Sequence, residues 1–102
     1  MVKKPSKYRA KITEIDGIKF HSRKEARYYC QLKIMVLANE VLYFLRQVPI
    51  YLPGNVKYVV DFVEFHVDGC VKYVDVKGFR TRSFIDKKKI VESLYPIKIE
   101  VI

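Results

Sequence analysis

The stretch that decides the fold is residues 58–78, which read YVVDFVEFHVDGCVKYVDVKG. Two apolar, β-branched runs lie on either side of Asp68-Gly69, a dipeptide typical of the turn of a β-hairpin. Each run contains one aspartate near the end away from the turn, Asp61 in the first and Asp75 in the second. An aspartate in such a strand is costly unless it is paired or binds a cation. The two aspartates therefore need a common explanation.

The register of this hairpin decides whether the aspartates meet. A two-residue turn would place Asp61 opposite Val76 and put the aspartates on opposite faces, whereas a three-residue loop or a bulge would place Asp61 opposite Asp75. Gly69 suits the left-handed position of a three-residue loop, so we predict that register. The shared face is then expected to hold Val59, Asp61, Val63, Phe65, Val71, Tyr73, Asp75 and Lys77.

Outward from the hairpin, the patterns predict one α/β domain, which is α+β in the stricter sense. A short hairpin is expected over 12–21, around Asp16-Gly17, and a helix from the cap Ser22 to Asn39. Strands follow at 42–51, 57–67 and 70–77. Ser83 is expected to cap a second helix that reaches Leu94, and 97–102 is expected to form the last strand.

Composition restricts the classes of partner. The 102 residues are 50% hydrophobic and carry a formal net charge of +9, which favours a polyanion such as nucleic acid, with a membrane surface as the other candidate. No apolar run approaches the roughly 20 residues of a spanning helix, and no signal peptide is apparent. Residues 1–11 form a basic arm that includes Lys7 and Arg9, before a single domain at 12–102. Cys30 and Cys70 are expected to be small buried hydrophobes in a reducing cytoplasm.

Two adjacent carboxylates and a lysine suit metal-assisted phosphate chemistry. Carboxylates about 4–5 Å apart repel each other unless a cation lies between them, and Mg²⁺ is a suitable ion. Such an ion binds a phosphate oxygen and activates water, while Lys77 adds a positive charge beside the phosphate or acts as a base. The backbone carbonyl of Val76 is a further candidate ligand. The alternative is a purely structural pairing of Asp61 and Asp75 with Lys77 or another base, and Lys77 at a strand end could simply be solvated.

This arrangement resembles the PD-(D/E)xK nuclease superfamily, in which an Asp and a D/E-x-K on neighbouring strands bind metal in a restriction-endonuclease-like α-β-β-β-α-β core with a mixed sheet flanked by two helices. Asp61 matches the first acid and Asp75-Val76-Lys77 the second acid and the lysine. Val60 replaces the usual proline, and Glu25 fits the glutamate found on the first helix. Within the superfamily the chain is similar to a small phage-associated group related to Holliday-junction resolvases. That similarity covers residues 12–102 and rests on FHSRKEA at 20–26, QVP at 47–49, YVVDF at 58–62, DVKG at 75–78, Thr81, KKK at 87–89 and Tyr95-Pro96.

The resemblance implies a Mg²⁺- or Mn²⁺-dependent endonuclease acting on DNA, with Holliday-junction-like DNA as one candidate substrate and a homodimer as the expected assembly. It implies Glu25, Asp61, Asp75 and Val76 as metal ligands, with Glu25, Asp61, Asp75 and Lys77 as the catalytic set. Neither a membrane nor a small-molecule cofactor is expected. The expected compartment is the cytoplasm, that of a bacterial host if the protein is encoded by a phage.

Several assignments have a structural alternative. Glu25 is also the third residue of a capping box begun by Ser22, so the functional role requires its carboxylate to turn toward Asp61 and not toward the Ser22 amide. Gln47 could reach the site or be a plain sheet-surface residue, and Ser22 and Thr81 are further accessory candidates. Charge runs are usually solvated, and the arm could be a solubilising tail. We nevertheless expect the basic residues of the arm and of the segment after Gly78 to contact phosphates, namely Lys7, Arg9, Arg80, Arg82, Lys87, Lys88 and Lys89.

Three functions remain open from the sequence. The first is the metal-dependent endonuclease. The second is a non-catalytic nucleic-acid-binding module that acts in a larger phage complex. The third is a structural or interaction protein in which the charge and the acid pair are incidental. The complete set of two acids and a lysine favours the first, because a module that only binds nucleic acid gains nothing from acids that face phosphate.

Overall fold

The computed structural model describes residues 12–102, so the predicted basic arm at 1–11, with Lys7 and Arg9, lies outside the described residues. Its elements are β1 (Thr13–Ile15), β2 (Ile18–Phe20), α1 (Arg23–Leu37), β3 (Val41–Leu52), β4 (Val56–His66), β5 (Val71–Asp75), α2 (Arg82–Leu94) and β6 (Ile99–Val101). The predicted α+β class and the predicted order of elements are both observed.

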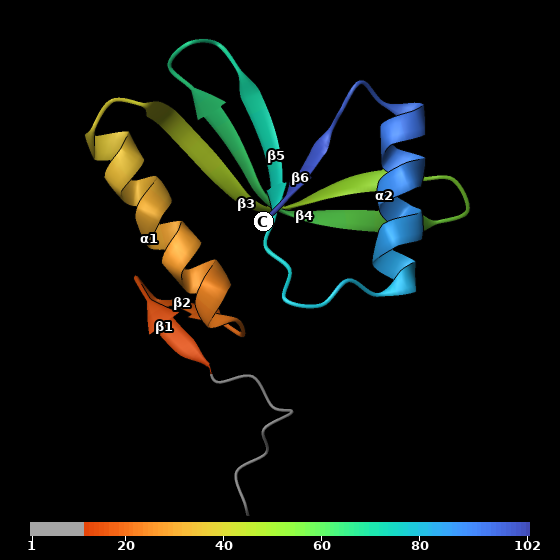
Figure 1. Ribbon diagram of the computed structural model, residues 1–102, viewed down its shortest axis with the longest axis horizontal. Helices are drawn as coiled ribbons and strands as arrows, with labels where there is room; N and C mark the ends of the chain where they lie inside the picture. The colour runs from red at the N-terminus through yellow and green to blue at the C-terminus, as the bar shows by residue number, and fades with distance from the viewer. Residues whose placement is uncertain (1–11) are drawn as a thin grey trace, which may run out of the picture.

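The main sheet is mixed and has four strands in the order β3-β4-β5-β6. The first three strands are antiparallel neighbours, and β6 pairs in parallel with β5. A parallel neighbour requires a crossover, which α2 supplies between β5 and β6. The strands β1 and β2 form a separate two-stranded sheet. Figure 1 shows α1 on one side of the main sheet and α2 on the other.

The register predicted for the central hairpin is confirmed. Phe62 pairs with Val74 and Val63 pairs with Tyr73, so the next pair along the strands would be Asp61 and Asp75. The turn is a three-residue loop at 67–69, closed by a hydrogen bond from the His66 amide to the Cys70 carbonyl. Gly69 has φ +94°, the left-handed conformation that such a loop needs.

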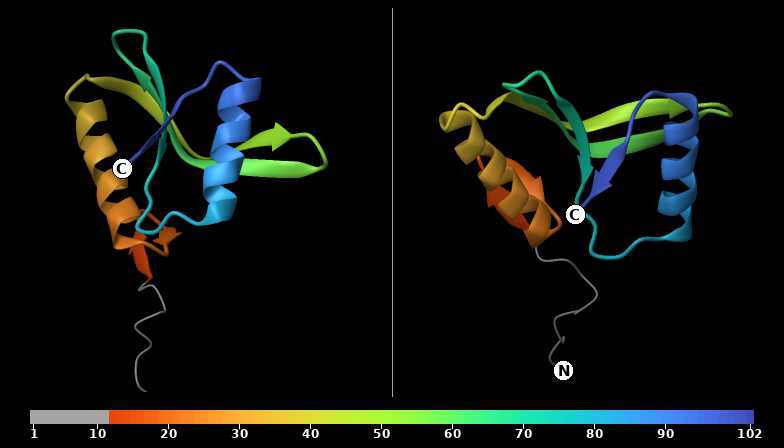
Figure 2. Two further views of the ribbon diagram at one scale, coloured as in Figure 1. Left: turned by 45° about the vertical axis from the view of Figure 1, so that its right-hand side comes forward. Right: turned by 45° about the horizontal axis from the view of Figure 1, so that its top comes forward.

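The long ribbon of β3 and β4 bends near its middle, as Figures 1 and 2 show. Phe62 packs in a core cluster with Tyr29 and Leu32 of α1. Val60, two residues before it, packs in a second cluster with Val91 of α2. Residues two apart on a regular strand share a face, so β4 changes face between them, at Asp61. The bend thus brings both helices next to this aspartate.

Side-chain caps start both helices. The Glu25 amide donates to Ser22 Oγ over 3.1 Å, as the capping box predicts. In α2 the cap is Thr81, whose Oγ1 accepts from the Phe84 amide over 3.1 Å. The prediction that Ser83 caps this helix is therefore wrong, because the chain becomes helical two residues earlier. The prediction for the cysteines also fails in part, since Cys70 is exposed and Cys30 is half-buried.

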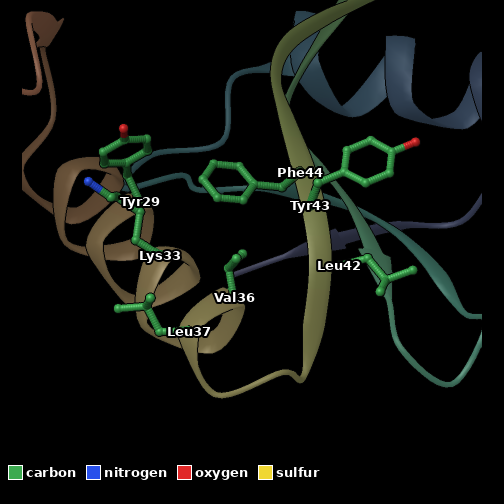
Figure 3. A pocket seen from close by; sticks show the side chains of 7 residues that line it. All are labelled: Tyr29, Lys33, Val36, Leu37, Leu42, Tyr43 and Phe44. Atoms are coloured by element: carbon green, nitrogen blue, oxygen red, sulfur yellow. The ribbon is translucent and has the colours of Figure 1, made fainter.

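An apolar groove runs between α1 and the first half of β3 (Figure 3). It has a volume of about 390 Å³, and Val36, Leu37, Leu42 and Phe44 are among the residues that line it. Leu37 is 83% exposed and Leu42 is 61% exposed, so apolar surface remains open to solvent there. Within the part of the chain described, neither helix has the length and hydrophobicity that crossing a membrane requires.

Candidate active site

The two aspartates lie where β4 and β5 separate, and each binds the backbone of the other strand. The Asp61 amide donates to Asp75 Oδ1 over 2.9 Å, and the Val76 amide donates to Asp61 Oδ2 over 2.9 Å. These bonds satisfy buried amides beyond the last ladder pair. The reciprocal contacts therefore hold both carboxylates at the end of the β4–β5 ladder, beside Val76.

Asp75 is the more deeply placed of the two. Its side chain is fully buried, and its second oxygen, Oδ2, accepts a hydrogen bond from the Tyr58 hydroxyl. Burial raises the pKa of Asp75 above its ordinary value, while the hydrogen bond from the Asp61 amide and the charge of Lys77 partly offset that shift. Asp75 is thus anchored from two sides within the sheet.

Glu25 is turned toward Asp61 and not back toward the cap. The carboxamide of Gln47 lies between the two acids, with Nε2 at 3.1 Å from Glu25 Oε2 and at 3.3 Å from Asp61 Oδ1. Ser22 therefore acts as the cap, while the Glu25 carboxylate is available to the site. One neutral donor holds two carboxylates together at this point.

The backbone of Gln47 is in an uncommon conformation. Its φ is +51°, and the β3–β4 ladder runs from Arg46–Phe62 to Val48–Val60 without a pair at Gln47. A left-handed conformation at a non-glycine residue costs on the order of 1 kcal/mol and is enriched at functional sites. Here it coincides with the bend in the ribbon, and the Gln47 side chain reaches the acids.

A cavity of about 330 Å³ opens between the first turn of α1 and the bend. Glu25, Asp61, Gln47 and Arg46 line it, together with Lys19, Phe20 and His21. Burial raises the pKa of Glu25, and the negative charge of Asp61 raises it further, whereas Arg46 and Lys77 oppose the shift. We call this space the acid cavity. It brings together two of the predicted carboxylates.

Arg46 approaches the acids but is not fully bonded. Its Nη2 lies 3.9 Å from Glu25 Oε2, and its guanidinium stacks 4.7 Å from the ring centroid of Phe20. Within residues 12–102, Arg46 Nε is a buried donor without a hydrogen-bond partner. Buried donors are normally satisfied, so this unpaired donor calls for an explanation.

Lys77 follows β5 and lies beside Asp61, with Nζ at 3.9 Å from Asp61 Oδ2. The ammonium also lies 5.0 Å from the centre of the Phe84 ring on α2. Its side chain is 27% exposed. Lys77 is thus a partly buried cation placed between the acid cavity and α2.

The predicted single face does not form as expected. Val63 and Phe65 pack in the cluster with α2, whereas Asp61 lines the acid cavity beside α1. Asp75 does not line this cavity. The bend at Asp61 is the reason, because it breaks the strict alternation on which the prediction relied. Over residues 12–102, no three His, Cys, Asp or Glu side chains are grouped closely enough to hold a metal ion as they stand.

The predicted phosphate-binding residues after β5 fall into three groups. Arg82 lies 3.9 Å from Asp86, and Lys88 lies 3.2 Å from Glu92, so these two cations are matched along the helix. Lys87 lines a second cavity with Lys77 and Thr81. Arg80 and Lys89 are exposed.

Three residues at or beside the site were not singled out from the sequence, namely Arg46, Lys57 and Tyr58. Arg46 directly precedes Gln47, and a cation next to a predicted site residue is the signal that could have found it. Tyr58 carries no such signal, because its contact with Asp75 depends on the bend. Lys57 is exposed at the start of β4.

Comparison with known proteins places the chain in a family. No curated protein and no solved structure matches it. Residues 5–101 match a family described as a protein of unknown function, DUF1064. The match extends over almost the whole chain and includes Glu25, Asp61, Asp75 and Lys77. The chain therefore belongs to the DUF1064 family.

Proposed function

We propose that the protein is a metal-dependent endonuclease of the PD-(D/E)xK type that hydrolyses phosphodiester bonds in DNA. The observation that carries the proposal is the convergence of Glu25, Asp61 and Lys77, from three separate segments, beside one cavity. Two acids share a single amide donor there, and a lysine lies next to one of them. Such a cluster has little value for stability, because buried charges cost more in desolvation than they return.

The donor set fits a hard divalent cation, Mg²⁺ or Mn²⁺. Glu25 and Asp61 supply carboxylate oxygens on either side of the Gln47 amide, and the raised pKa of Glu25 reflects unrelieved burial and repulsion. Asp75 and the Val76 carbonyl would complete the ligand set. Asp75 now binds Tyr58 and the Asp61 amide, so its participation requires that it exchange the Tyr58 hydroxyl for the ion.

The ion would supply a polarised phosphate oxygen and a water of lowered pKa. Side chains of the protein stabilise charge and position the reacting groups. Lys77 stabilises negative charge on the attacked phosphate or orients the attacking water. Arg46, which lines the acid cavity with Nη2 at 3.9 Å from Glu25 Oε2, adds a second positive charge for the phosphate. Gln47 holds Glu25 and Asp61 at a fixed separation, and Asp75 holds the strand that bears Asp61.

DNA is the proposed partner because the chain carries a net charge of +9 and because Lys77 and Lys87 lie on one side of the acids. Arg80, Arg82, Lys88 and Lys89 are proposed to add contacts to the backbone, and Lys7 and Arg9 to extend them from the arm. Ser22 and Thr81 act as helix caps that fix the elements around the site. The proposed compartment is the cytoplasm, that of the bacterial host for a phage-encoded chain.

A homodimer is proposed as the acting form, with the apolar groove between α1 and β3 as the contact. One chain presents one acid cavity, so cutting both strands of DNA at once requires two chains. Lys33 at the groove is ion-paired with Asp16, which leaves the lining without free charge. A polyanion has no reason to bind there, whereas a second copy of a strongly cationic chain would meet less charge repulsion at such a face.

The second candidate is a non-catalytic nucleic-acid-binding module. Its support is the position of Asp75, which is fully buried and bonded through both oxygens. In that case Asp61 and Asp75 serve to close the sheet edge, and the lysines alone contact DNA. This module would bind DNA with a steep dependence on salt but would not cut it.

The decisive test is cleavage of linear, nicked and four-way-junction DNA in Mg²⁺ or Mn²⁺ by wild type, Asp75→Asn and Lys77→Ala. We expect wild type to cut at least one substrate and each variant to be slower by about 10²-fold or more. Asp75→Asn keeps the shape and the bond from the Asp61 amide, so the fold should survive, which circular dichroism checks.

Asp86→Asn is the matched control, because Asp86 is an acid on α2 that pairs with Arg82 outside the site. It should cut like wild type. If wild type cuts none of the substrates, the enzyme proposal fails and the binding module takes its place. If Asp75→Asn cuts as fast as Asp86→Asn, the assignment of residues is wrong.

A further inference from the structure

A second cavity lies beside α2 and is lined mainly by basic and hydroxyl side chains. It has a volume of about 290 Å³, and Lys57, Lys77, Lys87, Thr81 and Ser83 are among its lining residues. The three lysines come from the start of β4, the segment after β5 and the second turn of α2. No acidic residue lines it. We call this space the basic cavity. Its lysines are far apart in the sequence, so the fold brings them together and not a local run of charge.

The lysines of the basic cavity are poorly neutralised. Within the described part of the chain, neither Lys57 nor Lys87 forms an ion pair, whereas Lys88 on the same helix pairs with Glu92 over 3.2 Å. Lys77 has only the 3.9 Å contact with Asp61. Three ammonium groups around one small space repel each other. An anion in the basic cavity would relieve that repulsion.

The wall of the basic cavity is fixed by packing. The rings of Tyr58 and Phe84 stack with their centroids 6.1 Å apart, and Lys77 Nζ lies 5.0 Å from the Phe84 centroid. Tyr58 is itself anchored on Asp75 through its hydroxyl. Lys77 therefore packs against Phe84, which stacks on the tyrosine that binds Asp75.

We propose that the basic cavity binds a phosphoryl group of the nucleic acid, next to the phosphate that is cleaved. Lys77 lines the basic cavity, and its Nζ lies 3.9 Å from Oδ2 of Asp61, which lines the acid cavity, so this ion pair links the two spaces. Lysine ammoniums and hydroxyls are common phosphate ligands, and acids are not. The inference rests on the proposed function for the identity of the polymer, but the phosphate chemistry rests on the basic cavity alone.

Small probes test the phosphate chemistry directly. Backbone amide shifts of the full chain are followed by NMR during titration with thymidine, thymidine 5′-phosphate and the dinucleotide TpT. We expect the amides of Lys57, Ser83 and Lys87 to shift with a phosphorylated probe and not with thymidine. Shifts with thymidine 5′-phosphate alone identify a terminal monoester as the ligand, and shifts with both identify a backbone phosphate. If thymidine shifts these amides equally, or no probe does, the proposal is overturned.

DNA binding without metal tests the place of the basic cavity in the complex. The double variant Lys57→Ala/Lys87→Ala should lower the slope of log affinity against log salt by about 1, because both lysines serve one phosphate. The matched control Lys72→Ala/Lys98→Ala removes the same charge from exposed positions outside the basic cavity and should change the slope much less. An equal loss in the control would mean that net charge alone binds DNA, and the proposal would fail. This assay measures binding and not cleavage, so the two proposals can fail separately. If the chain binds DNA in this way but does not cut it, the nuclease proposal fails and the proposal for the basic cavity holds.

Discussion

At the scale of single residues, the surroundings of the buried acids distinguish a site from a structural pair. Glu64 is 1% exposed, but the Tyr28 hydroxyl and His66 Nε2, at 2.8 Å, bind its carboxylate. Its burial is fully explained by those partners. Glu25 instead has one neutral donor, the Gln47 amide that it shares with Asp61, and its cation Arg46 lies 3.9 Å away. This incomplete compensation at Glu25, beside the carboxylate of Asp61, makes the two acids a candidate for binding a cation.

The charge of Glu25 should reduce stability at neutral pH. Burial, followed by Asp61, raises the pKa of this carboxyl in the folded state, so the native protein binds a proton more tightly than the unfolded chain. Stability is therefore lost as pH rises from the ordinary carboxyl pKa of about 4.3 through the raised folded value. We expect Glu25→Gln to have a higher Tm than wild type at pH 7, with the difference disappearing near pH 4.

The same variant should cut DNA at least about 10²-fold more slowly, because a ligand carboxylate is lost. Differential scanning calorimetry from pH 4 to pH 7, together with the cleavage assay, measures both effects. Gain of stability with loss of activity is expected where like charges are held together for function. A Tm at pH 7 below that of wild type would contradict the argument.

At the scale of elements, the start of α2 shows how local capping determines the boundary of a helix. Thr81 and Ser83 are both plausible caps by residue type. The structure uses Thr81, which leaves Ser83 within the first turn, where its side chain lines the basic cavity. The choice of cap therefore also decides which hydroxyl is available to a ligand.

Alanine at the two positions should separate these roles. Thr81→Ala removes the bond to the Phe84 amide and should lower the free energy of unfolding by about 1 kcal/mol. Ser83→Ala should change it by less than about 0.5 kcal/mol, as for an ordinary exposed position. Urea unfolding followed by circular dichroism gives both values. If Ser83→Ala is the more damaging, the assigned cap is wrong.

At the scale of the whole molecule, charge and apolar surface are separated. Three lysines lie beside α2, whereas the groove between α1 and β3 exposes leucines and, among residues 12–102, has no unpaired charge. β3 is an edge strand, as Pro49 within it requires. This separation suits the proposed binding of a polyanion on one side and of a second copy on the other.

The assembly is tested by sedimentation equilibrium at micromolar concentration. Wild type is expected at twice the 12.1 kDa mass of one chain. Leu42→Asp places a charge in the groove and should give monomers. Tyr51→Asp, an equally exposed position on the same strand but outside the groove, should leave the dimer intact. A monomeric wild type, or a dimer that survives Leu42→Asp, would exclude the groove as the contact.

Much of the fold follows from local signals in the sequence. Alternating apolar residues, the Asp68-Gly69 turn and the Ser22 cap act over a few residues, so their structural consequences are visible in the sequence. The three-residue loop, and with it the opposition of Asp61 and Asp75, follows from the left-handed preference of Gly69. Asp61 and Lys77 are candidates from the strand pattern in the same way, whereas Glu25 is a candidate through the resemblance to the PD-(D/E)xK superfamily.

The arrangement of the site depended on contacts between distant segments. The bend at Gln47 and Asp61 breaks strand alternation, turns Asp61 toward Glu25 and leaves Asp75 with Tyr58. That bend results from the packing of the two halves of the ribbon on two different helices, an interaction that no local pattern records. The sequence by itself determined that Asp61 and Asp75 lie opposite each other on neighbouring strands, with Lys77 beside them. Only the tertiary structure decided which carboxylates share a cavity, because packing on α1 and α2 sets the burial and the orientation of each side chain.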